Sequence, residues 1–226
     1  MPTYKGTFTN KSGTYLIEVF NDFDDFHLEI AQFKFSGNDL DGLALENLSE
    51  LSSAEKLFDL EKIKVSYENG QEGNDYELRN FVLQLKIPQI IIDRVERKEQ
   101  EIVMDFQLEL KEDFEEAKVE VEINHQYFEG KNGLLELVFD QIQKQFEGKY
   151  RFKNCYGCLY GDYSVYGQGF MSSILCFKNQ KEKYLKVQNK DEYLNLELHD
   201  SQQQEIFCCD EYEIRDRSVG YRGTVK

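Results

Sequence analysis

Residues 104–123 read MDFQLELKEDFEEAKVEVEI, and this stretch decides the fold class. Apolar side chains occupy every second position of residues 104–110 and again of residues 119–123, with polar or charged side chains between them. A period of two is typical of a strand with one face in the core and the other in water. The charged residues 111–116 predict a turn, so the whole stretch predicts an antiparallel hairpin. We interpret its many acidic side chains as the solvated face of a sheet.

The same alternation recurs toward the N-terminus. Residues 4–19 predict a second hairpin around a turn at residues 10–13. Residues 26–35 and 81–87 predict further half-buried strands, and Pro88 ends the last of them because proline cannot donate to a strand ladder. The N-terminal half therefore predicts an antiparallel sheet.

One amphipathic helix is predicted after these strands. Asn132 is a suitable N-cap, the apolar residues of 135–146 recur at helical spacing, and Gly148 suits the end of the helix. All five cysteines and nine of the fourteen tyrosines lie beyond residue 149, so the composition also changes here. We predict a β-rich domain at 1–129 and a helix plus β-rich, Cys- and Tyr-rich domain at 130–226, with a soft boundary that one continuous domain would also fit.

The predicted fold class is α+β, mainly β: an antiparallel sheet or sandwich, then one amphipathic helix, then a second β-rich portion. Regular strand alternation with a single long helix excludes a doubly wound α/β fold and leaves sandwich and barrel both open. Beyond the helix, strands are predicted at residues 150–152, 170–177, 183–187, 193–198, 205–214 and 218–225.

The chain carries a formal net charge of −16. This charge repels phosphate backbones and anionic membranes, so we expect neither nucleic acid nor membrane as a partner. It suits a basic protein partner, because opposite charges speed association.

The first residues, MPTYKG, lack the apolar core of a signal peptide, and no apolar run reaches the roughly 18 residues of a membrane span. We interpret the five cysteines as thiols in a reducing compartment and expect a cytoplasmic location.

A glycine- and tyrosine-rich loop at residues 160–167 is the candidate binding site. Asp162 and Ser164 are suited to fix the loop through local hydrogen bonds, while Tyr163 and Tyr166 would present rigid side chains to a protein partner. The alternative is that the tyrosines pack over a sheet edge and the loop folds on itself. Arg222 is a candidate counter-charge for Asp162.

The cysteines are candidate zinc ligands. Cys155 and Cys158 form a C-x-x-C pair, and Cys176 with Cys208 (or Cys209) would complete a tetrahedral structural site. The alternative is a set of packed or free thiols, because a lone cysteine in an apolar strand is usually a small buried hydrophobe. Redox use of the pair is not favoured, since no helix start follows it.

Catalysis has weaker support. The sequence has no Gly-x-Ser-x-Gly elbow, P-loop or His-Glu-x-x-His motif, so we do not expect an enzyme. The remaining alternative is a Cys-dependent enzyme in which the fold brings His199 near Cys208 or Cys176, or one centred on Cys155 and Cys158.

The C-terminal third resembles an uncharacterised bacterial family whose members carry a C-x-x-C-x-x-x-D-Y-S-x-Y-G pattern followed by a cysteine-containing strand. The matching residues are Cys155, Cys158, Asp162, Tyr163, Ser164, Tyr166, Gly167 and Cys176. In composition the chain also resembles immunity proteins of polymorphic toxin systems, which bind and block a toxin. The acidic charge and the Tyr-rich loop favour a cytoplasmic protein-binding module, and the compositional resemblance implies one of the immunity type. The alternative is a zinc-stabilised domain or a Cys-dependent enzyme centred on Cys155 and Cys158.

Overall fold

A computed structural model describes residues 1–66, 70, 72–164, 169–196 and 199–220. The chain divides into two compact units, which we call the first unit (Met1–Lys86 and Phe106–Ala117) and the second unit (Ile87–Asp105 and Lys118–Lys226). The predicted boundary near residue 130 stays a prediction, because units defined by contacts are not the same as independently folding domains.

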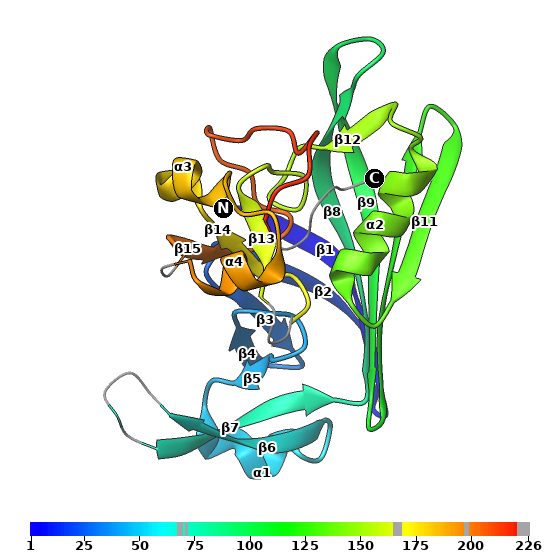
Figure 1. The fold of residues 1–226 in the computed structure, drawn as a ribbon. Coiled ribbons are helices and arrows are strands. Elements are labelled where there is room, and N and C mark those ends of the chain that lie inside the picture. The colour runs from blue at the N-terminus through cyan, green and yellow to red at the C-terminus, as the bar shows by residue number, and fades with distance from the viewer. Residues whose placement is uncertain (67–69, 71, 165–168, 197–198, 221–226) are drawn as a thin grey trace. The chain divides into compact units, whose positions relative to one another are not determined.

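The first unit is an antiparallel sheet of strand order β8-β1-β2-β3-β4-β5-β7-β6 (Figure 1). Its own elements are β1 (Thr3–Asn10), β2 (Gly13–Asn21), β3 (Phe26–Ile30), β4 (Phe33–Gly37), β5 (Ala44–Leu45), η1 (Leu48–Glu50), α1 (Leu51–Ala54), β6 (Asp59–Ser66) and β7 (Glu72–Arg79). Three long strands contribute a segment to each unit: β8 (Phe81–Asp93), β9 (Lys98–Lys111) and β10 (Phe114–Ile123). The predicted end of a strand at Pro88 is wrong, because β8 continues through Pro88 to Asp93.

Alternation fixes which face of these strands is buried. In β9, Met104, Phe106 and Leu108 are buried while the residues between them are exposed or half-buried, as the sequence predicts. The core of the first unit is aromatic: the ring of Phe58 lies edge-on to Phe35, with ring centroids 5.2 Å apart. Burying each such side chain stabilises the fold by about 1.5–3 kcal/mol.

The second unit has a sheet of order β11-β10-β9-β8, with β12 also paired to β8, and a separate three-stranded sheet of order β13-β14-β15. Its own elements are β11 (Gln126–Asn132), α2 (Leu135–Gln145), β12 (Tyr150–Phe152), β13 (Gly161–Tyr163), β14 (Ile174–Cys176), η2 (Lys178–Gln180), α3 (Lys181–Tyr184), α4 (Lys190–Leu194) and β15 (Ser201–Gln203). The predicted α+β, mainly β class is confirmed.

The predicted amphipathic helix is α2. Val138, Phe139 and Ile142 on its inner face are fully buried, and the ring of Phe139 stacks on Tyr156 at 4.7 Å. The helix begins later than its cap predicts, because Asn132 accepts the N–H of Leu134 at 3.1 Å and closes the turn that precedes the helix.

Several strands predicted near the C-terminus are wrong. Residues 183–187 and 193–196 belong to or follow the short helices α3 and α4, and residues 205–214 contribute only the isolated bridge between Cys158 and Ile214. Short apolar runs fit both the two-residue period of a strand and the 3.6-residue period of a helix, so tertiary packing decides which of the two forms. The predicted strand at 218–225 lies mostly outside the described residues.

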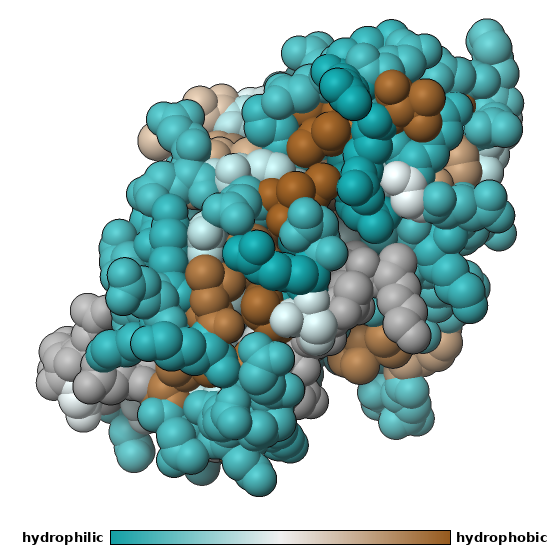
Figure 2. Space-filling model, turned by 45° about the horizontal axis from the view of Figure 1, so that its top comes forward, coloured by the Kyte–Doolittle hydropathy of each residue, from teal (hydrophilic) through white to brown (hydrophobic). Residues whose placement is uncertain are grey.

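Of the helices in the described part of the chain, none combines the length and apolar character that crossing a bilayer requires. On the face drawn in Figure 2, hydrophilic side chains predominate and hydrophobic ones form smaller patches.

Candidate functional site

The described part of the predicted binding loop, residues 160–164, is largely buried. Asp162 and Tyr163 lie in β13 and are fully buried, Ser164 is half-buried, and Tyr166 lies outside the described residues. Tyr160 is also buried, and its hydroxyl donates to Glu213 at 2.6 Å. A side chain in this position cannot contact a partner without rearrangement, so the packing agrees with the alternative in which the loop folds onto the protein.

Asp162 is part of a buried polar network in the second unit. The hydroxyl of Tyr184 donates to Oδ2 of Asp162 at 2.8 Å and accepts from Arg215 at 2.6 Å. Burial raises the pKa of Tyr184, the charge of Asp162 raises it further, and Arg215 lowers it. The phenol therefore stays protonated at neutral pH and can donate and accept at once.

Arg215 is 1% exposed and satisfies its guanidinium with backbone oxygens. It donates to the carbonyls of Gly161 at 2.6 Å and Val219 at 2.8 Å, and also to those of Cys158 and Leu159. A buried charge is tolerated only with such partners. Arg215 thus ties the 158–161 segment to the 215–219 segment.

The counter-charge predicted for Asp162, Arg222, lies outside the described residues. The basic side chain that reaches the hydroxyl of Tyr184, and through it Asp162, is Arg215. Gly220 closes this network: its φ is +68°, and a Cβ there would lie 2.2 Å from Oδ2 of Asp162, so only glycine fits.

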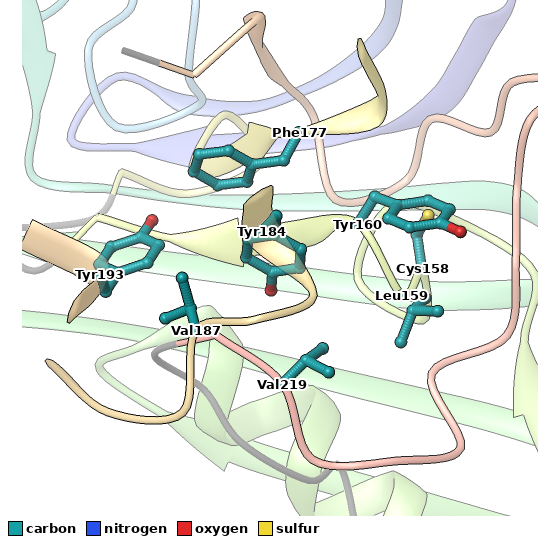
Figure 3. Packing of buried hydrophobic residues seen from close by; sticks show 8 residues of the cluster. All are labelled: Cys158, Leu159, Tyr160, Phe177, Tyr184, Val187, Tyr193 and Val219. Carbon is teal, nitrogen blue, oxygen red and sulfur yellow. The ribbon is translucent and has the colours of Figure 1, made fainter. Parts of the chain in front are cut away.

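An apolar cluster surrounds the network. The rings of Phe177 and Tyr184 lie face to face, with centroids 4.7 Å apart and 6° between their planes (Figure 3). The buried members of the cluster are Cys158, Leu159, Tyr160, Phe177, Tyr184, Val187, Tyr193 and Val219. The arrangement is that of a small hydrophobic core, which gives the network a structural role.

All five cysteines are free thiols, and Cys155 and Cys158 are buried. Burial raises the pKa of Cys155 and of Cys158, and it raises the pKa of Cys208 to about 11. These three thiols are protonated at neutral pH and are therefore weak nucleophiles.

The predicted zinc ligands are not arranged as a site. Among the described residues, which include every cysteine, no group of three or more His, Cys, Asp or Glu side chains is placed to hold a metal ion. Cys155, Cys158, Cys176 and Cys208 therefore fit the alternative of packed thiols, because burial of lone thiols contributes as apolar packing does.

The Cys–His alternative also lacks a contact. Asp200, next to His199, donates its backbone N–H to the carbonyl of Cys176 at 2.8 Å, so the two segments are neighbours. Within the described part of the chain, however, no cysteine sulfur is hydrogen-bonded to a histidine. A nucleophile needs such a base.

The first unit contains a charged cleft that the sequence analysis missed. Its volume is about 560 Å³, within the range of ligand-binding sites. Phe58 and Leu60 are its apolar residues. The remaining lining residues are Lys11, Glu55, Asp59, Glu61, Arg79, Asn80, Lys111, Glu112 and Glu115.

Ion pairs neutralise part of this lining. Lys11 pairs with Asp59 at 2.7 Å, Arg79 pairs with Glu61 at 2.6 Å, and Lys111 pairs with Glu109. Arg79 is held further by Glu77 at 2.8 Å and by the carbonyl of Asp41 at 2.8 Å. These pairs fix the cationic side chains and leave a surplus of carboxylates.

That surplus consists of Glu55, Glu112 and Glu115. All three are exposed, and none of them forms an ion pair with any described residue. Glu112 and Glu115 lie at the turn between β9 and β10, the charged turn of the hairpin that decides the fold class. The cleft therefore offers carboxylates to a cationic ligand.

A family model, that of a family of unknown function (DUF6304), matches residues 2–161. The match covers the cleft and ends one residue before Asp162, so of the motif quoted above it includes only Cys155 and Cys158. The predicted resemblance to an uncharacterised family is confirmed; the motif itself and the resemblance to immunity proteins stay predictions. No curated protein and no solved structure matched the chain.

Proposed function

The chain belongs to the DUF6304 family of unknown function, and we propose from its own geometry that it is a protein-binding module that holds a basic segment of a partner in the cleft of the first unit. The observation that carries the proposal is the surplus of Glu55, Glu112 and Glu115 in a cleft whose cations are already paired. Lysine or arginine side chains of a partner would form ion pairs with these carboxylates.

The net charge of −16 supports the same class of partner. Long-range attraction speeds the encounter with a basic protein, and cleft carboxylates then select where its cations dock. Because the pairs form at a solvated surface, binding would weaken as salt is added.

The tip of the β9–β10 hairpin adds an aromatic contact. Phe114 is 43% exposed and lies between Asp113 and Glu115. An aromatic ring beside carboxylates suits arginine, which stacks on the ring and pairs with the acids. Hairpin tip and cleft together form one recognition surface.

An immunity-type inhibitor is the form of this module that we would test first. A toxin that acts on nucleic acid needs a cationic substrate site, and an acidic cleft is suited to cover such a site. The five free thiols support a reducing, cytoplasmic compartment for the complex. The zinc and Cys-enzyme alternatives have less support, because among the described residues no group of three or more candidate ligands lies together and no cysteine sulfur is hydrogen-bonded to a histidine.

A fluorescent oligo-arginine peptide tests the proposal. We expect it to bind, and the double variant Glu112→Gln/Glu115→Gln to weaken binding roughly five- to tenfold, since two exposed ion pairs are worth at most about 1 kcal/mol each. The matched control is Glu29→Gln/Glu101→Gln, which removes the same charge at exposed positions outside the cleft. Equal weakening by both pairs would show diffuse attraction and contradict a cleft site.

A further inference from the structure

The outer edge of β11 is closed by side chains of α2. Gln141 accepts the backbone N–H of Lys131 at 2.9 Å and donates to its carbonyl at 3.2 Å. Gln145 does the same at Glu129, accepting its N–H at 3.3 Å and donating to its carbonyl at 2.5 Å. The two amides thus satisfy the four backbone groups that these two residues would present to a neighbouring strand.

The arrangement works because a glutamine side chain ends in the same amide as a peptide unit. Gln141 and Gln145 are four residues apart, so they lie on one face of α2. Between their partners, Gly130 has no room for a side chain: a Cβ there would lie 2.2 Å from the carbonyl oxygen of Val138. Figure 1 draws α2 alongside β11, and the hydrogen bonds given above show that both amides reach the strand.

An uncapped β11 would be suited to pair with itself. Glu129 and Lys131 flank Gly130, and residues two apart in a strand point their backbone groups to the same edge. In an antiparallel pair centred on Gly130, Glu129 of one copy stands opposite Lys131 of the other, twice. Each such pair exchanges two backbone hydrogen bonds and brings opposite charges together.

We propose that Gln141 and Gln145 are a built-in cap that keeps the edge of β11 from pairing with β11 of a second copy of this chain. Exposed strand edges are templates for association, and proteins commonly cover them. The cap is independent of the cleft and of its partner. It uses hydrogen bonds alone, so it can be removed without disturbing the buried face of α2.

The test is self-association of Gln141→Ala/Gln145→Ala, measured by sedimentation over a range of concentrations. We expect the variant to associate at least about tenfold more tightly than the unchanged protein, with helix content retained because alanine favours helix. Lys144→Ala, which is exposed on α2 and makes no bond to β11, is the matched control and is expected to leave association unchanged. An unchanged association of the double variant with α2 intact would overturn the proposal.

Register gives a second, independent readout. Adding Glu129→Lys to the double variant places like charges opposite each other and is expected to reverse the association. Adding Lys131→Glu as well restores opposite charges and is expected to restore it. If Glu129→Lys leaves the association as tight as before, the pairing is not the one proposed.

Amide hydrogen exchange tests the cap even if a variant folds poorly, because it can be measured on the unchanged protein and on single variants. Gln141→Ala is expected to speed exchange at Lys131, and Gln145→Ala at Glu129, each leaving the other amide protected. Fast exchange at both amides in the unchanged protein would show that the cap is not formed and would overturn the proposal.

Discussion

Arg79 in the first unit and Arg215 in the second unit each bind several oxygen atoms, but their surroundings differ. The side chain of Arg79 is 24% exposed and is balanced by two carboxylates, those of Glu61 and Glu77. Arg215 is 1% exposed and is held by carbonyl oxygens and one phenol. Charge in the cleft is balanced by other charges next to water, where a partner can compete for them. The charge of Arg215 is enclosed by backbone carbonyls and the Tyr184 hydroxyl, which also contacts the buried carboxylate of Asp162, so it stabilises the fold.

The largest expected effect on stability comes from replacing Arg215, with the same replacement at Arg79 as the comparison. Arg215→Met would leave several buried carbonyls and the Tyr184–Asp162 pair without their cation, so we expect it to lower the free energy of unfolding by about 3–5 kcal/mol. Arg79→Met is the counterpart and is expected to cost about 1–2 kcal/mol, because water can replace its contacts. Urea unfolding measures both. Equal losses would remove the distinction between an enclosed and a solvated arginine.

A medium effect is expected at Gly220. Gly220→Ala forces an L residue into a left-handed conformation and drives a methyl group against Asp162 and Tyr184, so we expect a loss of about 2–4 kcal/mol. Gly148→Ala is the control: its φ is +79°, but a Cβ there meets nothing within 4 Å, so only about 1 kcal/mol is expected. A thermal scan of both variants separates crowding from backbone strain. Similar losses would mean that the network is not closed at Gly220.

The smallest effect concerns pH and the loop beside Arg79. Burial and the charge of Asp41 raise the pKa of Asp39 from 3.8 to about 7, although the N–H of Gly42 lowers it. The folded state therefore holds this proton more tightly than the unfolded state. The stability that Asp39 contributes is complete below its unfolded pKa and is lost as pH rises through about 7.

Asp39→Asn removes that loss, because the amide still accepts from Gly42, at 2.7 Å in the parent protein, and does not ionise. As the pH rises from about 5 to about 8, we expect the free energy of unfolding of the variant to increase relative to that of the parent by on the order of 1 kcal/mol. Chemical unfolding at both values measures the gain. A difference between the two proteins that is constant with pH would show that Asp39 is already ionised in acid.

The parts of the fold that could be predicted are those with a long local period. The hairpin at residues 104–123 and the helix at residues 135–146 each repeat their apolar positions often enough to fix the element. The strands predicted at residues 183–187 and 193–198 are too short for this. The helices α3 and α4 form instead because Tyr184 and Tyr193 are packed into a shared core. The local hydrophobic pattern therefore predicted the fold class. It did not predict the short C-terminal elements, whose secondary structure is decided by tertiary packing.

The candidate site was harder to predict. The cleft combines side chains such as Lys11, Glu55, Arg79 and Glu115, which are far apart in the sequence and share no motif. Arg215 lies in the polar run Ile-Arg-Asp-Arg-Ser, which has the composition of a surface segment, so its burial leaves no trace in the sequence. The spacing of Gln141 and Gln145 places both on one face of a helix. The sequence does not show that this face meets the edge of β11, because only the fold brings the strand beside the helix.

The shared strands β8, β9 and β10 have a consequence for protein production. The first unit needs Met1–Lys86 together with Phe106–Ala117, so no uninterrupted fragment contains it and nothing else. A truncation after residue 86 removes its share of β9 and β10, and a truncation after residue 129 cuts through β11. Excising the cleft as a minimal binder would therefore require joining two distant segments with a designed linker.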